Sequence, residues 1–418
     1  MSHPRHAAAA GEPLTPSASV PSAALVSGTR FPALDGLRIV GAVAVVTTHV
    51  GFESGEAISG PFNGLLSRLD AGVALFFVVS GFLLFGPHVR AHLQALPGPA
   101  TAAYLKHRAL RILPPLWIAV AAVWAFIPLS PGVSGWTYLR HATLTQIYGS
   151  DGSTWGLTQM WSLATEAAFY LALPVLAWLL TRGGRDRRWL PRTTSVLLGL
   201  QVIAMVWLGI AHTGGNERAA LWLPAYLGWF GVGMALAAWH WSRRLGGAPT
   251  GTLDAIAATP GAVYALAAGW FVLLSTPIAG PYTLEPPSVG AALVKNLGYA
   301  VLGGLLVLPA VAPLANGSRI VAALSSGPAK VLGDISYGVF CYHLVVLGLV
   351  ERAIHHEVLH GNFWPLELLT LAITLPVAWL SYRFVERPIM RWGRRSESAS
   401  PTASAAITTD AIPASTPH

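Results

Sequence analysis

Charged side chains are scarce in this sequence. Asp, Glu, Lys and Arg make up 11% of the 418 residues, whereas about a quarter of an ordinary soluble domain is charged. Hydrophobic residues make up 53% of the chain. A soluble fold with so few charges would leave apolar surface in contact with water, so the composition favours a lipid bilayer as the solvent of this chain.

Cysteine is almost absent. The single thiol, Cys341, cannot form a disulfide within the chain, and there is no CxxC motif or cluster of Cys and His. His355, His356 and His360 are close in sequence but lack a second group of ligands. We therefore expect no metal site and no permanently bound cofactor.

A basic patch is also missing. Lys and Arg exceed Asp and Glu by 8, but the basic residues are distributed between long apolar runs. A nucleic-acid-binding surface would gather them in one region with interleaved aromatic residues. We expect no nucleic-acid partner.

Both ends of the chain have few large apolar residues. Residues 1–30 are mainly Ala, Ser and Pro, and they lack the basic start and apolar core of a secretory signal. Residues 393–418 contain much Ser, Thr, Ala and Pro. We predict a disordered cytoplasmic lead over 1–30, a membrane domain over 31–392 and a disordered tail over 393–418.

Apolar runs of about 20 residues, the length that crosses a hydrocarbon core of about 30 Å, recur through the membrane domain. They predict an all-α polytopic membrane protein with about ten transmembrane helices. Their approximate extents are 36–52, 71–89, 111–129, 161–181, 193–212, 220–241, 258–279, 290–313, 335–354 and 364–385.

The cationic residues indicate the orientation of these helices. If the N-terminus is cytoplasmic, ten spans place about four cationic residues inside for each one outside. Losing one span would reverse every later loop and remove this bias. We predict that both termini are cytoplasmic.

The first predicted helix carries two residues that are costly inside a membrane. Arg38 and His49 occur in LDGLRIVGAVAVVTTH, and their spacing places them on one helix face, about 16 Å apart along the axis. This arrangement suits an elongated anionic ligand with its charged end at Arg38 and its reactive end near His49. Taken singly, Arg38 could instead reach lipid headgroups, and His49 could bond a neighbouring helix.

Six segments in a fixed order resemble the integral-membrane acyltransferase-3 family. Two positions depart from the family pattern: Ala167 stands where many members have a second Glu, and Tyr342 stands where a Trp commonly precedes the His. The six segments are the Arg38 and His49 pair, GVALFFVVSGFLLF at 72–85, Arg108 and Arg111 with Pro114, WSLATEAAFY at 161–170, DISYGVFCYH at 334–343 and YRFVERP at 382–388.

The resemblance implies a membrane O-acyltransferase in the plasma membrane of a bacterium. Such an enzyme moves an acyl group from acyl-CoA to a hydroxyl of a sugar-containing acceptor, which would be a cell-envelope glycan or a glycosylated secondary metabolite such as a macrolide. The expected partners are therefore acyl-CoA, this acceptor and the lipid bilayer. A secondary transporter of an organic anion is the alternative, because it would also need Arg and His within the membrane.

The residue types fit this chemistry. An alcohol needs a base to become a good nucleophile, and the unperturbed pKa of His lies near neutrality. We therefore expect His49 to act as the general base and Glu166 to orient it. Arg108 and Arg111 lie one helical turn apart, and we expect them to bind CoA phosphates with Arg38, although they could simply anchor the helix at the membrane surface.

Several polar and aromatic residues have open roles. Ser80 resembles an acyl nucleophile, but Ser and Gly in membrane helices more often permit close packing, so direct transfer is expected. His343 either lines the acceptor cavity or is structural. Trp155 and Trp161 could stack on a sugar ring or lie at the membrane interface.

Overall fold

The computed structural model describes residues 30–128, 132–149, 154–186, 188–245, 251–283, 285–313 and 317–398. Within these ranges the chain forms helices and no β-strand. Of the two ends predicted to be disordered, 1–30 and 393–418, residues 1–29 and 399–418 lie outside the described residues. The last helix continues to Ser398, so regular structure extends beyond residue 392.

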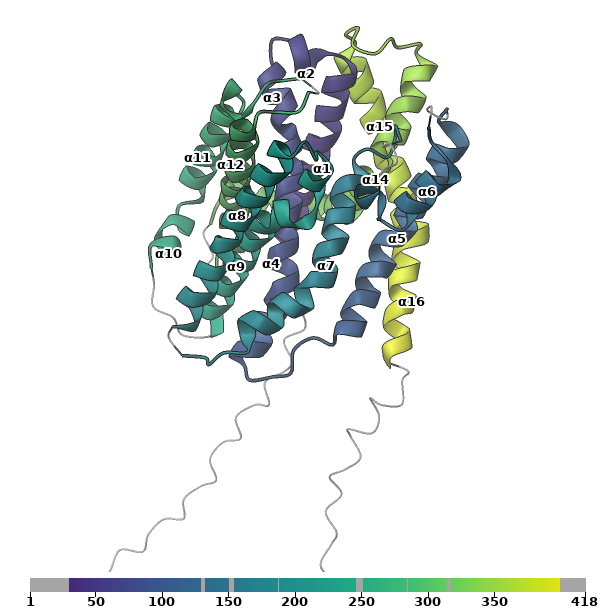
Figure 1. Ribbon diagram of the computed structural model, residues 1–418. Helices are drawn as coiled ribbons and strands as arrows, with labels where there is room; N and C mark the ends of the chain where they lie inside the picture. Colours follow the sequence, from purple (N-terminus) through teal and green to yellow (C-terminus); the bar gives the residue numbers. More distant parts are fainter. Residues whose placement is uncertain are drawn as a thin grey trace, which may run out of the picture.

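Long helices packed side by side form a bundle (Figure 1). The long helices are α1 (Pro32–Glu53), α4 (Gly72–Leu93), α5 (Thr101–Phe126), α7 (Met160–Thr181), α8 (Trp189–Thr213), α9 (Leu227–Leu245), α12 (Val289–Val307), α14 (Gly327–Ala353) and α15 (Phe363–Ser381). The shorter helices are α2 (Glu56–Ser59), α3 (Asn63–Arg68), α6 (Gly135–Ala142), α10 (Thr252–Ala257), α11 (Pro260–Leu274), α13 (Arg319–Leu324) and α16 (Arg387–Ser398). A π-helical turn, Tyr382–Glu386, joins α15 to α16.

Eight helical segments of the described chain are long and apolar enough to cross a membrane. They confirm the prediction of an all-α polytopic membrane protein. The remaining two predicted spans fall on α9 and α11. Helix α11 has 15 residues and is about 23 Å long, which is shorter than the hydrocarbon core. Helix α9 has 19 residues, most of them buried among other helices, so it needs a less apolar surface than a helix that faces lipid. The count of ten crossings therefore stays a prediction.

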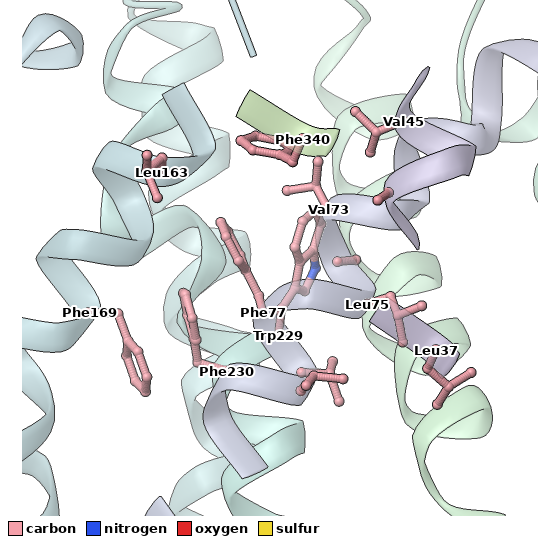
Figure 2. Close-up of a cluster of buried hydrophobic side chains, with 14 of the residues drawn as sticks. Leu37, Val45, Val73, Leu75, Phe77, Leu163, Phe169, Trp229, Phe230 and Phe340 are labelled. Atoms are coloured by element: carbon pink, nitrogen blue, oxygen red, sulfur yellow. The ribbon is translucent and has the colours of Figure 1, made fainter. Parts of the chain in front are cut away.

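Helices α4 and α9 cross at a point where both helices carry a glycine. A Cβ atom on Gly233 would collide with the carbonyl oxygen of Val78, and one on Gly81 would collide with that of Phe230. Nearby, the Phe77 ring stacks on the Phe230 ring, with 4.4 Å between centroids (Figure 2). Small residues let membrane helices approach closely and gain van der Waals contact, so this crossing forms a tightly packed centre of the bundle.

The first and last described residues lie at the same end of the bundle. Phe31 lines a cavity together with Pro97 and Pro99, which lie between α4 and α5. Near the start of α5, Lys106 Nζ donates to the carbonyl oxygen of Gly393 in α16 over 3.2 Å, and α16 ends beside this region (Figure 1). An even number of crossings would produce this arrangement. The side of the membrane that this end faces stays a prediction.

Candidate active site

Arg38, Arg108 and Arg111 line one cavity, which we call the arginine cavity. Arg38 comes from α1, and the other two come from the first half of α5. Among the described residues, no side chain or carbonyl forms a hydrogen bond or ion pair with these guanidinium groups, and Arg108 Nε is buried without a partner. Three unpaired cations at one cavity form a suitable site for an anion with several negative oxygens.

Glu166 of α7 lines the same cavity. Its Oε1 atom accepts hydrogen bonds from the hydroxyl of Ser80 on α4 and from Tyr170 Oη, the latter over 2.8 Å. Ser80 is thus a donor to this carboxylate. The fixed negative charge offsets part of the charge of the three arginines.

The structure does not bring Glu166 to His49. The expected contact assumed that α7 begins at the surface of the bundle, so that Glu166 would lie at the depth of His49. Instead, Gln159 and Trp161 at the start of α7 line the cavity that contains His49. Glu166 follows more than one helical turn later and shares a cavity with Arg38, which lies about 16 Å along α1 from His49.

His49 lines a second, larger cavity, which we call the histidine cavity. Its Nδ1 atom is 2.7 Å from the carbonyl oxygen of Val45, one turn earlier on α1. A carbonyl oxygen only accepts hydrogen bonds, so this contact requires the proton on Nδ1. In the neutral ring, the basic lone pair is then on Nε2, as a general base needs.

His343 of α14 contacts His49. Its Nδ1 atom is 2.8 Å from the carbonyl oxygen of Phe340 and must donate to it, which leaves His343 Nε2 as an acceptor. This nitrogen is 3.4 Å from His49 Nδ1. His343 therefore favours the same tautomer of His49 that Val45 requires, and it takes the orienting position that we had expected for Glu166. The sequence offered two signals for His343, its position in the middle of an apolar helix and its place in the DISYGVFCYH segment, but neither indicated a contact with His49.

The histidine cavity has a volume of about 640 Å³, within the range of about 300 to 1,000 Å³ typical of small-molecule sites. Asp70 Oδ2 accepts a hydrogen bond from Lys295 Nζ over 2.6 Å. The sequence analysis did not predict Asp70 and Lys295 as residues of the site, because they come from distant segments that meet only in the fold. Side chains on the cavity wall include the aromatic Trp155, Trp161, Tyr226 and Trp229 and the polar Asp70, Lys295 and Asn296.

The two cavities adjoin each other. Val73 of α4 and Phe340 of α14 line both of them. Figure 2 shows these two side chains close together, with Val45 of α1 nearby. A ligand long enough to pass this junction would contact the arginines at one end and His49 at the other.

In the part of the chain that the structure describes, no group of three or more His, Cys, Asp and Glu side chains could hold a metal ion. Cys341 is buried. The ionisable groups that line the two cavities include the His49 imidazole, the Glu166 carboxylate and the guanidinium groups of Arg38, Arg108 and Arg111.

Comparison with known proteins connects this site to a family. Residues 31–383 match the acyltransferase domain family. Peptidoglycan O-acetyltransferase OatA of Listeria monocytogenes is 24% identical over 381 residues, which cover 87% of this chain and 56% of that protein. The putative peptidoglycan O-acetyltransferase YrhL of Bacillus subtilis is 24% identical over 388 residues, covering 88% of this chain and 56% of that protein.

A third relative has a similar length. Nodulation protein 10 of Rhizobium leguminosarum bv. viciae is 25% identical over 388 residues, covering 85% of this chain and 92% of that protein. The chain spans little more than half the length of the first two relatives. No solved structure matches it. Because the family match covers most of the chain and includes both cavities, this multi-pass membrane protein belongs to the acyltransferase domain family, in agreement with the resemblance of its motifs.

Proposed function

We propose that this chain is a membrane O-acyltransferase that moves an acyl group from acyl-CoA to a hydroxyl of a sugar-containing acceptor. The observation that carries the proposal is the junction between a cavity with three unpaired arginines and a cavity with an oriented histidine. Family membership supports acyl transfer. The names of two relatives support a cell-envelope glycan as the acceptor, and a glycosylated metabolite such as a macrolide is the other class.

The arginine cavity is the proposed donor site. CoA carries phosphates at one end and the acyl thioester at the other, and guanidinium groups bind phosphate oxygens through paired N–H donors. Arg38, Arg108 and Arg111 would hold the phosphates, while the pantetheine arm passes Val73 and Phe340 toward His49. Acyl-CoA is a cytoplasmic metabolite, so the proposal requires the end of the bundle where α5 begins to face the cytoplasm, and the distribution of cations supports this orientation.

The tautomer of His49 determines which ring nitrogen would take the proton in the reaction. As His49 Nε2 takes the proton of the acceptor hydroxyl, the oxygen attacks the thioester carbonyl carbon. The carbon–sulfur bond then breaks, and the imidazolium returns the proton to the leaving CoA thiolate. The products are an O-acyl ester and CoA. Val45 and His343 keep the His49 ring in the orientation that this exchange requires.

Transfer by the purified protein tests the proposal. We would incubate the protein in detergent with acetyl-CoA and either an N-acetylhexosamine oligosaccharide or a glycosylated macrolide, and detect the ester by mass spectrometry. If the ester formed at the same rate without protein, the proposal that this protein catalyses the transfer would be rejected. Uptake of an organic anion into vesicles without any ester formation would instead support a transporter.

Removing the α5 arginines should weaken donor binding. We expect Arg108→Ala with Arg111→Ala to raise the KM for acyl-CoA at least tenfold, since charged hydrogen bonds contribute about 1.5 to 3 kcal/mol each. The KM for the acceptor should change little. Arg319→Ala is the matched control, because this exposed arginine of α13 does not line the arginine cavity. Equal increases in both KM values would mean that the pair supports the helices and not the donor.

The separation of Glu166 from His49 predicts how their substitutions combine. Groups that act as one unit give non-additive losses, whereas groups without shared partners give losses that multiply. We expect the losses in kcat/KM to multiply in His49→Ala/Glu166→Gln. In His49→Ala/His343→Ala the combined loss should be smaller than the product. If the losses instead multiplied in His49→Ala/His343→Ala but not in His49→Ala/Glu166→Gln, Glu166 and not His343 would be the residue that orients His49.

A further inference from the structure

The histidine cavity carries more negative than positive side chains. Glu53, Asp70 and Glu217 line it, and Lys295 is the one Lys or Arg on its wall among the described residues. The Lys295 ammonium is already bound to Asp70, and Glu217 contacts His212 Nδ1 over 3.2 Å. Glu53 has no Lys or Arg partner in the described part of the chain. The charge of the wall therefore favours a ligand with a positive group near Glu53.

Glu53 lies one helical turn beyond His49, on the same face of α1. The two residues are about 6 Å apart along the axis, a distance that one sugar ring can span. Glu53 Oε1 accepts a hydrogen bond from Trp155 Nε1 over 3.3 Å, whereas Oε2 has no partner among the described residues. Because Glu53 ends α1, the negative end of the helix dipole opposes its charge. Local structure thus gives this carboxylate no stabilising cation.

His356 is the neighbouring group that could neutralise Glu53. Its Nε2 atom is 3.4 Å from the carbonyl oxygen of Glu53 and must donate to it. Its Nδ1 atom is buried without a hydrogen-bond partner. A second proton on this ring would therefore create an unsatisfied buried donor. These contacts fit a neutral His356, which leaves the charge of Glu53 uncompensated.

A second carboxylate lies near Glu53. Glu351 of α14 is 9% exposed, and its Oε1 atom is buried without a hydrogen-bond partner. It lines a neighbouring cavity that shares Trp155 and Val358 with the histidine cavity, and it is near enough to Glu53 for their charges to interact. Two like charges close together are unfavourable until a cation binds beside them. Glu351 therefore strengthens the attraction of this region for a cation.

Aromatic side chains supply the rest of the recognition surface. Trp155, Trp161, Tyr226 and Trp229 all line the histidine cavity. The faces of Trp and Tyr rings attract cations, and proteins use such rings to recognise ammonium groups. A protonated amine would satisfy both the carboxylate and the aromatic faces, whereas a neutral amide would satisfy neither charge.

We propose that the histidine cavity binds an amino-sugar acceptor whose protonated amine lies at Glu53, while a hydroxyl of the same sugar reaches His49. This inference rests on the proposed function and names its acceptor class, a glycoside with a basic amine. The reaction is unchanged. The hydroxyl oxygen forms the ester bond as the carbon–sulfur bond breaks, the hydroxyl proton passes through His49 to the CoA thiolate, and the ammonium group keeps its protons.

Two acceptors that differ only at the nitrogen test this inference. They are the methyl glycosides of N,N-dimethylglucosamine, which is cationic near neutral pH, and of N-acetylglucosamine, which is neutral. Neither nitrogen can form a further stable amide, so the product is an ester. With acetyl-CoA as donor, we expect kcat/KM to be about tenfold higher for the cationic glycoside, because hydrogen bonds to charged groups are the stronger ones. Glu53→Gln should remove this preference by raising the KM of the cationic glycoside alone.

Gln at position 53 can still accept the hydrogen bond of Trp155, so the substitution removes the charge and keeps this contact. Glu367→Gln is the matched control. Glu367 of α15 is buried, accepts a hydrogen bond from Thr47 Oγ1 on α1 and does not line the histidine cavity, so this variant should keep the wild-type preference.

The outcomes separate this inference from the proposed function. Equal kcat/KM values for the two glycosides in the wild type, or an unchanged preference in Glu53→Gln, would overturn the role of Glu53 and leave the proposed function intact. Absence of any ester with both glycosides and with the acceptors of the earlier test would reject the proposed function, and this inference with it.

Discussion

Replacing His49 with Ala is expected to lower the kcat/KM for acyl transfer by about 10²- to 10⁴-fold, the usual contribution of a positioned general base. The substitution removes the Nε2 lone pair that would take the acceptor proton in the proposed reaction. It should leave donor binding almost unchanged, because the phosphates would be held at Arg38, about 16 Å away along the helix. Steady-state kinetics and binding of a non-hydrolysable acyl-CoA analogue measure the two quantities separately.

His141→Ala provides a matched control for this prediction. His141 of α6 is 1% exposed, and its Nδ1 atom contacts the carbonyl oxygen of Thr137 one turn earlier, over 2.8 Å. It therefore repeats the local bonding of His49 without lining either cavity. Activity of the His49 variant above a tenth of the wild-type value would exclude His49 as the essential base.

Gly233→Val should produce the largest loss of stability. A side chain at this position collides with the backbone of α4 at Val78, so the two helices must separate along their whole crossing. Overpacking commonly costs about 1 to 3 kcal/mol, and we expect the free energy of unfolding to fall by at least the upper value because backbone cannot move aside as a side chain can.

Thermal unfolding in detergent, followed together with size-exclusion chromatography, checks this expectation. Gly209→Val on α8 is the control, because a Cβ atom there would have no neighbour within 4 Å. If the two variants unfold at the same temperature, close approach of α4 and α9 does not stabilise the bundle.

The helices themselves could be predicted from the sequence, because a bilayer demands long apolar segments whatever the fold. Each predicted span falls on a helix of the structure, including α9 and α11. Hydropathy alone does not show that α9 is enclosed by other helices or that α11 is short. The enclosure of α9 depends on tertiary packing, which an apolar run does not encode, whereas α11 is bounded by Pro260 at its start and by Pro277 shortly after its end.

Part of the site could also be predicted from the sequence. Arg38 and His49 lie on the same helix, so their relation depends only on local periodicity. The expected contact between Glu166 and His49 was wrong because it depended on the relative depth of α1 and α7. The contact between His49 and His343, on α1 and α14, and the junction at Val73 and Phe340 arise only when distant segments pack together.

Because Arg38 and His49 lie on one continuous helix, α1 fixes the distance between them. A helix resists compression, so the interval between the anion-binding group and the base cannot adapt to the ligand. In the proposed function, a donor would be selected by the distance between its phosphate and its thioester, and not only by the identity of either group. Short thioesters such as acyl N-acetylcysteamines, which lack the phosphate, would have to reach the base without an anchor. If the proposed function is correct, the length of the donor arm between phosphate and thioester is therefore a determinant of specificity.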